Sequence, residues 1–151
     1  MSFQLHNSYT FWISRLASVM QEKFNKELNT LDVTWPQWMV MNVLTHELAE
    51  TPAHIADQIG VDRSAVTRLV DRLEKKGLVV REHDGLDRRS VKIHITAPGK
   101  LMVKHLDEAA ERHQKKFLDE LLNTEHRALK GNLQKLLRAG GVETALLWKH
   151  V

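Results

Sequence analysis

Hydrogen-bonding side chains gather at the start of one amphipathic segment, residues 63–76. They are Arg63, Ser64, Thr67, Arg68 and Arg72, and the small apolar Ala65 lies among them. At helical spacing, positions 64, 67 and 68 share the face opposite Val66, Leu69 and Val70. Arginine can bond guanine with two hydrogen bonds, serine and threonine can bond bases or phosphates, and alanine can touch the thymine methyl group. These side chains could therefore contact base edges in a DNA groove, although a solvent-exposed helix face often looks the same.

A second polar group lies in residues 84–90, between two runs of alternating apolar residues. It contains Asp87, Arg88 and Arg89. Arginines at an exposed tip could enter a narrow minor groove, where the negative potential is enhanced. Asp87 could hold one arginine in place, which favours Arg89 as the contact. The alternative is a solvated turn. Further upstream, the amides of a helix that starts at Pro52 and Ala53 could bind a phosphate.

The elements that would position these groups are three short helices and a hairpin. Thr34 and Gln37 have the spacing of a capping box for a helix to about residue 47. A second helix would follow Thr51, and Gly60 would end it before a third helix that Asp62 caps. The period then changes from 3.6 to 2 over residues 78–83 and 91–95, which predicts a β-hairpin. A helix-turn-helix followed by a hairpin is a winged helix, here residues 34–99.

Long amphipathic helices are expected on both sides of this unit. One runs from Leu5 to about Leu28, and another from Thr96 to about Leu122. Asn123 and Thr124 would cap a last helix, which Gly140 and Gly141 end. The predicted fold is therefore mainly α with a small β-hairpin. The flanking helices exceed what a minimal winged helix requires, so they need a separate function.

The composition excludes several classes of protein. A chain of 151 residues predicts one domain, and the net charge of +3 is only mildly basic. The absence of cysteine excludes disulfides, thiolate catalysis and cysteine-based redox sensing. No signal peptide or apolar run of about 20 residues is visible, so a cytoplasmic protein is expected and a membrane partner is not. No nucleophile–base pair or phosphate-binding loop has a suitable context, so neither an enzyme nor a cofactor is expected.

The sequence resembles the MarR family of bacterial transcription regulators over essentially its whole length. The most specific match is Asp87-x-Arg89, five residues, Ile95-Thr96, two residues and Gly99. This pattern follows the family's wing signature, with isoleucine where leucine is commoner. Residues 55–61, 64–70 and 73–79 are similar to the family's helix-turn-helix.

The resemblance implies a single domain over residues 1–151 that forms an obligate homodimer. Residues 1–30 and 100–151 would supply the dimerisation helices. It also implies binding of double-stranded DNA at a pseudo-palindromic operator, usually as a repressor. Arg68 would then lie in the major groove and Arg89 in the minor groove, with Asp87 orienting an arginine.

Many relatives bind small aromatic acids between the dimerisation helices and the DNA-binding part. The residues that would wall such a cleft are Trp12, Arg15, Trp35, Trp38 and Asn42. The alternative is that the tryptophans belong to the core. Two other functions stay open, a zinc-responsive regulator using His105, Glu108 and His113, and a winged helix that binds protein. Because no cysteine is present and the histidines are scattered, no metal site is expected.

Overall fold

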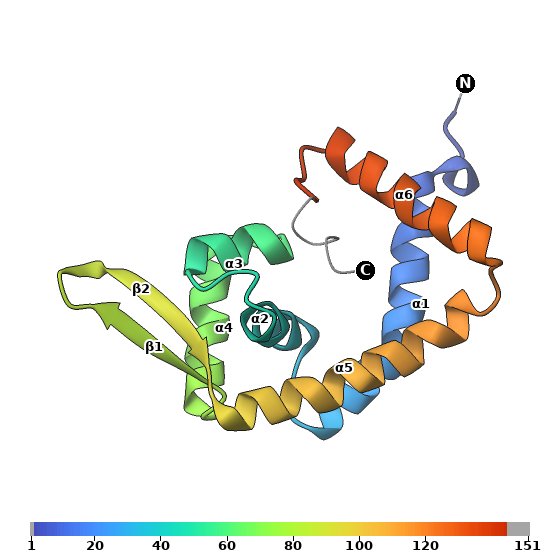
Figure 1. Ribbon diagram of the computed structural model, residues 1–151. Coiled ribbons are helices and arrows are strands. Elements are labelled where there is room, and N and C mark those ends of the chain that lie inside the picture. The colour runs from blue at the N-terminus through green and yellow to red at the C-terminus, as the bar shows by residue number, and fades with distance from the viewer. Residues whose placement is uncertain (1, 145–151) are drawn as a thin grey trace.

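The computed structural model describes residues 2–144 as one chain of helices with a single hairpin (Figure 1). The elements are η1 (Leu5–Asn7), α1 (Tyr9–Thr30), α2 (Trp35–Thr45), α3 (Pro52–Ile59), α4 (Arg63–Lys75), β1 (Val79–Asp84), β2 (Asp87–Ile95), α5 (Ala97–Leu118) and α6 (Asn123–Ala139). Helices α2, α3 and α4 gather at one end, from which the hairpin projects, and α5 runs from the hairpin towards α1. We call residues 34–99 the helix-turn-helix lobe. The predicted fold class, a mainly helical winged helix-turn-helix with long flanking helices, is confirmed.

Local hydrogen bonds explain where the lobe's helices begin and end. The Thr34 hydroxyl accepts from the backbone N–H of Gln37 at 3.3 Å, and the Gln37 side chain accepts from that of Thr34 at 3.2 Å. The Asp62 carboxylate accepts from the backbone N–H of Ala65 at 2.7 Å. Gly60 ends α3 with a φ of 73°, in the left-handed region that glycine enters without strain. The predicted caps at these positions are therefore confirmed.

Four predicted boundaries are wrong, and one of them is the end of α5, which lies at Leu118 rather than at about Leu122. Helix α1 begins at Tyr9 rather than Leu5, because Ser8 caps it and residues 5–7 form a short 3-10 helix. Helix α6 is capped by Leu122, whose backbone N–H donates to the Glu125 carboxylate at 2.8 Å, and not by Asn123 and Thr124. In the hairpin, pairing of Asp84 with Asp87 extends the ladder into the segment expected to be a loop.

One hydrophobic core joins the lobe to the two long helices beside it. The largest side chains that are wholly buried are Leu28, Met41, Ile55, Leu73, Ile93 and Leu106. They come from α1, α2, α3, α4, β2 and α5 in turn, so every element around the lobe contributes. Helix α6 contributes no buried residue, and α1 contributes none before Phe24.

The start of α5 is fitted tightly against the lobe. A Cβ atom added to Gly99 would lie 2.3 Å from the backbone oxygen of Leu78 and 2.6 Å from Cδ1 of Ile95. The Thr96 hydroxyl accepts from the Gly99 N–H at 3.1 Å and donates to the Gly77 carbonyl at 2.7 Å. This close approach explains why only glycine fits the last position of the wing signature.

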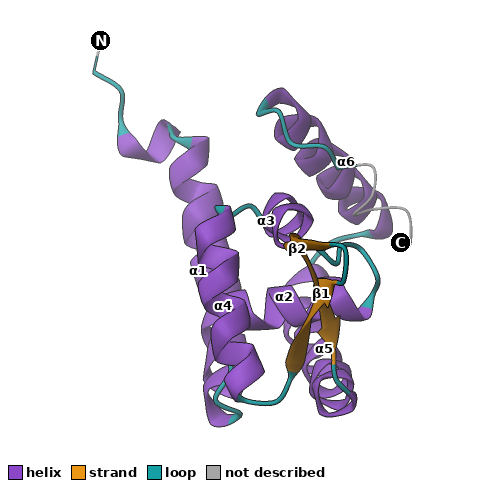
Figure 2. Ribbon diagram, turned by 90° about the vertical axis from the view of Figure 1, so that its left-hand side faces the viewer, coloured by secondary structure: helices purple, strands orange, loops and turns teal. Residues whose placement is uncertain are grey.

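The first half of α1 and all of α6 lie apart from the core as two arms. They overlap in Figure 1, but Figure 2, turned by 90°, separates them. Large apolar side chains are exposed on both arms and directly before them, namely Leu5 in η1 with Tyr9, Trp12, Ile13, Leu16 and Val19 in α1, and Leu122 before α6 with Leu129, Leu136 and Leu137 in it. No helix in the described part of the chain is both long and apolar enough to span a membrane.

Candidate nucleic-acid interface

Helix α4 is held by its apolar face and presents its polar face to solvent. Val66, Val70 and Leu73 are buried under it. The predicted contact residues lie on the opposite side: Arg63, Ser64, Thr67, Arg68 and Arg72 are exposed, and Ala65 is half-buried. The three arginines form no ion pair with any residue that the structure describes. Their charges are therefore available to a polyanion.

Two hydroxyl groups on this face already donate within the protein. Ser64 donates to the Asp62 carboxylate, and Thr67 donates to the backbone carbonyl of Arg63 at 3.2 Å. The hydrogen bond from Ser64, with a second from the Ala65 N–H, holds the pKa of Asp62 below its ordinary value. Towards a ligand, both hydroxyls are therefore placed as acceptors, which suits a base amino group better than a phosphate.

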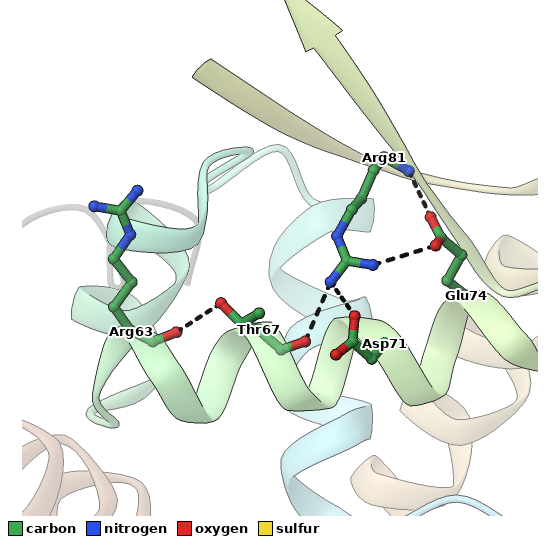
Figure 3. A network of polar contacts seen from close by, with 5 residues as sticks. All are labelled: Arg63, Thr67, Asp71, Glu74 and Arg81. Atoms are coloured by element: carbon green, nitrogen blue, oxygen red, sulfur yellow. Dashed lines mark hydrogen bonds and ion pairs between the residues drawn. The ribbon is translucent and has the colours of Figure 1, made fainter. Parts of the chain in front are cut away.

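An arginine on the hairpin ties the wing to α4 (Figure 3). The Arg81 guanidinium donates to Asp71 at 2.5 Å, to Glu74 at 3.2 Å and to the Thr67 carbonyl at 3.2 Å. Its backbone N–H also donates to the Glu74 carboxylate, at 3.1 Å. The side chain is only 21% exposed. This network ties the wing to α4 at a fixed place, and it neutralises Asp71 and Glu74 on that helix.

Sequence reasoning missed Arg81, which it counted only within a mixed run of charges. The signal is a pair of acids at helical spacing, Asp71 and Glu74, followed by an arginine in the first strand after the helix. Opposite charges on two elements that a tight turn connects can form ion pairs. The net charge of the segment does not reveal such pairs, because the charges cancel in the sum.

The hairpin is also attached to the loop before α3. The backbone N–H of Ile93 donates to the Glu50 carbonyl at 2.7 Å, and Lys92 pairs with the Glu50 carboxylate at 3.1 Å. The backbone of residues 87–89 forms the start of β2, at the tip of the hairpin that projects from the helices of the lobe (Figure 1). The side chains of Asp87, Arg88 and Arg89 are outside the described part of the structure, so their roles remain predictions.

The helix α3 begins beside α4, as the sequence predicts. The Thr51 hydroxyl accepts from the His54 N–H at 3.3 Å, and Pro52 occupies the first turn. Pro52 and Ala53 are both half-buried. Pro52 has no N–H and Thr51 caps the N–H of His54, so the Ala53 N–H is the first-turn amide without a side-chain cap. Phosphate binding at this amide remains a prediction.

The residues predicted to bind an effector form two groups within this chain. Trp12 and Arg15 lie on the exposed part of α1, where Arg15 lines an open groove of about 500 Å³. Trp35 and Trp38 instead contact Phe24, with ring centroids 5.8 and 5.0 Å away. Because twelve residues separate Trp12 from Phe24 on the same helix, the groups are about 18 Å apart along α1. Both tryptophans of the second group also pack against the core, as the alternative interpretation holds.

The fifth predicted effector residue, Asn42, meets an acid on α5. Its side-chain amide donates to Asp107 Oδ1 at 2.9 Å, and the Trp38 indole N–H donates to the same oxygen at 3.0 Å. His46 approaches Asp107 Oδ2 at 3.0 Å. Sequence reasoning missed Asp107, because its partners lie more than 60 residues away in the chain.

The histidines considered for zinc do not form a metal site in the described part of the chain. No three acidic or histidine side chains gather there closely enough to bind a metal ion. His113 instead contacts Glu27 at 2.7 Å, and Arg112 pairs with the same carboxylate at 3.2 Å. The hydrogen bond from His113 lowers the pKa of Glu27, with burial opposing the change and Arg112 adding to it. This cluster joins α1 to α5.

A helix-turn-helix with an anchored hairpin and unpaired arginines on its second helix defines the winged-helix class of DNA-binding proteins. The MarR family model matches residues 31–90 of this chain. The HTH-type transcriptional regulator YfiV of Bacillus subtilis is 36% identical over 109 residues, which cover 72% of this chain and 68% of YfiV. The chain therefore belongs to the MarR family, and it is a DNA-binding transcriptional regulator, not an enzyme.

Solved structures agree with this assignment. CouR from Rhodococcus jostii RHA1, bound to p-coumaroyl-CoA, is 28% identical, with a TM-score of 0.76 over 89% of this chain and 95% of CouR. MepR of S. aureus, in complex with DNA, has a TM-score of 0.81 over 87% of this chain and 98% of MepR. At 24% identity, MepR shows the shared fold alone.

Proposed function

We propose that this chain acts as a homodimer that binds a pseudo-palindromic operator and represses transcription. The observation that carries the proposal is the polar face of α4, where three unpaired arginines lie beside a wing that Arg81 holds in place. In a dimer, two such helices would enter major grooves about one helical turn apart, near 34 Å.

The roles of the individual residues follow from their positions. Arg68 lies on the exposed face of α4 and is proposed to form hydrogen bonds with a guanine. Ser64, Ala65 and Thr67 are proposed to contact neighbouring base edges. The flanking contacts are proposed to involve Pro52, Ala53, Arg63 and Arg72 on the phosphates, with Arg89, Arg88 and Asp87 at the minor groove.

The two exposed arms support a dimer. A compact protein of 17.4 kDa has an accessible surface of about 7,900 Å². This chain has 10973 Å², and its excess includes the apolar faces of α1 and α6. Obligate dimers bury roughly 2,000–5,000 Å² in total, so covering both arms would suffice.

A small-molecule effector is proposed to act where α1 and α2 meet α5. CouR supports this proposal, because it has the same fold and was solved with p-coumaroyl-CoA. In this chain the aromatic group around Trp35 and Trp38 lies at that junction. Arg15, the cation expected to hold an aromatic acid, is far from these rings within one subunit.

Arg68→Ala tests the DNA contact. If Arg68 bonds a base with two hydrogen bonds, the substitution should weaken specific binding by about 1–3 kcal/mol, or roughly 10- to 100-fold. Gel-shift titration on a duplex selected in vitro measures this loss. Lys116→Ala is the matched control, since Lys116 is an exposed cation of α5 and lies away from α4. Unchanged affinity and unchanged sequence preference for Arg68→Ala would contradict the role.

Removal of residues 123–151 tests the dimer. The full chain should sediment as a dimer, and the shortened chain should sediment as a monomer or aggregate, because the exposed apolar face of α1 would lose the apolar face of α6 as its proposed partner. Analytical ultracentrifugation at micromolar concentration distinguishes these states. A full chain that sediments as a monomer would refute the proposal.

A further inference from the structure

Asp107 is a carboxylate whose charge is poorly balanced. It is 28% exposed, and two of its three partners, Trp38 and Asn42, are neutral donors. The third is His46, the residue directly after α2, whose side chain is 53% exposed. No lysine or arginine of the described residues pairs with Asp107. By contrast, the other carboxylate near the aromatic group, Glu27, has both Arg112 and His113.

The three partners of Asp107 lie along one side of α2 and its C-terminal cap, His46. Positions 38, 42 and 46 are four residues apart and so follow successive helical turns. Each of them reaches across to the same carboxylate on α5 at 2.9–3.0 Å. Asp107 therefore links a helix of the lobe to the long helix that leaves it.

This arrangement does not suit an acid. A ligand carboxylate needs hydrogen-bond donors, but the indole N–H of Trp38 and one amide N–H of Asn42 are already directed at Asp107. A second carboxylate beside them would lie close to Asp107, and two like charges at such a site repel each other. A cation has the opposite preference, because a partly buried carboxylate and aromatic rings both attract it.

From these contacts we propose that the Asp107 junction binds an aromatic cation, such as an amidinium or a primary amine. The cationic group replaces His46 at Oδ2, and the ligand ring packs on Trp38, whose indole N–H bonds the other oxygen. His46 can leave because its side chain is exposed and lies at the end of the helix. Binding removes one of the three links between α2 and α5.

The consequence for DNA binding rests on the proposed function. A ligand that breaks a link between α2 and α5 favours another position of the lobe, and it weakens DNA binding by the ratio of its affinities for the two positions. The binding of the cation itself does not depend on that function.

Benzamidine and benzoate test the proposal, because they have nearly the same shape and opposite charge. The four tryptophans of the ¹⁵N-labelled full chain should show four indole N–H signals, and Trp38→Phe identifies one. Benzamidine should shift the Trp38 signal with a Kd on the order of 1 mM, and benzoate should not. Equal shifts with both compounds, or no shift with benzamidine, would overturn the proposal.

Matched substitutions locate the charge. Asp107→Asn should weaken benzamidine binding by at least about fivefold. Glu108→Gln removes one charge at the adjacent, exposed position and should change nothing. His46→Ala removes the competing side chain and should tighten binding. If Asp107→Asn binds as well as the wild type, or Glu108→Gln binds as weakly as Asp107→Asn, the assignment is wrong. If Asp107→Asn does not fold, unchanged binding by His46→Ala overturns it.

A DNA titration separates this proposal from the previous one. Benzamidine, but not benzoate, should weaken binding to the selected duplex, and Asp107→Asn should lose this response. A chain that binds no DNA contradicts the proposed function and leaves the indole result standing. A chain that binds DNA but shows no indole shift contradicts the cation site alone.

Discussion

Replacement of Arg81 by methionine should loosen the wing from α4 and lower the stability of the protein. Methionine keeps an aliphatic side chain of similar length but removes every donor of the guanidinium. Arg81 itself is 21% exposed, whereas its partners Asp71 and Glu74 are 54% and 43% exposed. Because these acids can return to water, each ion pair contributes only about 0.5–1 kcal/mol to the free energy of unfolding.

The hydrogen bond from Arg81 to the Thr67 carbonyl adds about 1 kcal/mol, since its donor is charged and largely buried. The expected loss is therefore about 2–3 kcal/mol. For a chain of this size that corresponds to a fall in Tm of about 4–12 °C. Arg81→Lys should recover part of the loss, because an ammonium group can pair with one acid but cannot reproduce the planar fork.

Thermal and urea unfolding at one fixed protein concentration measure the loss. Arg72→Met is the matched control, since Arg72 is an exposed arginine of α4 that forms no ion pair with the described residues, and the unfolding free energy of this variant should change by less than about 0.5 kcal/mol. In a double-mutant cycle, Asp71→Asn should have little further effect once Arg81 is removed. Mutational effects on the free energy of unfolding add within about 0.5 kcal/mol. If the free energy of unfolding of Arg81→Met lies within that margin of the wild-type value, the network does not hold the wing.

Three further substitutions test the packing around Gly99 and the ion pairs of Glu27. Gly99→Ala should destabilise the protein by about 1–3 kcal/mol, because its Cβ atom would meet the Leu78 carbonyl at 2.3 Å. Gly131→Ala, in an open part of α6, should instead stabilise it by about 0.5–1 kcal/mol, and equal effects on Tm would contradict this contrast. Glu27→Gln should reduce stability by about 1 kcal/mol at neutral pH. The folded-state pKa of Glu27 is lowered, so its contribution is complete above its ordinary value of 4.5 and disappears as the pH falls below it. Urea unfolding across this range should show the difference from wild type shrinking in acid, and a constant difference would argue against the pair with His113.

The helix boundaries of the lobe were predictable because short-range contacts set them. Thr34 and Gln37 bond each other across one turn, and Gly60 adopts a left-handed conformation that its own residue type permits. The sequence shows such contacts directly. The polar face of α4 was predictable for the same reason, since helical spacing alone places Arg68 opposite the buried Val66.

The contacts that hold the lobe in place were not predictable from the sequence. Asp107 meets Trp38 across 69 residues, and only the packing of α5 on α2 brings them together. The sequence placed Trp12 and Trp35 on the first two helices, where the family resemblance implies an effector cleft, but within one chain the length of α1 keeps them apart. The hairpin extends further than expected because strand pairing overrides the turn preference of a charged segment.

The close packing at Gly99 means that a small tilt of α5 would displace the lobe. The helix has 22 residues without a break and is therefore about 33 Å long, and its first turn is packed closely against Leu78 and Ile95. A tilt of about 6° at its far end would displace the lobe by about 3.4 Å, which is the rise of one base pair along a DNA strand. An event at the distant end of α5 could thus shift α4 by a full base-pair step through a rotation that leaves every helix intact.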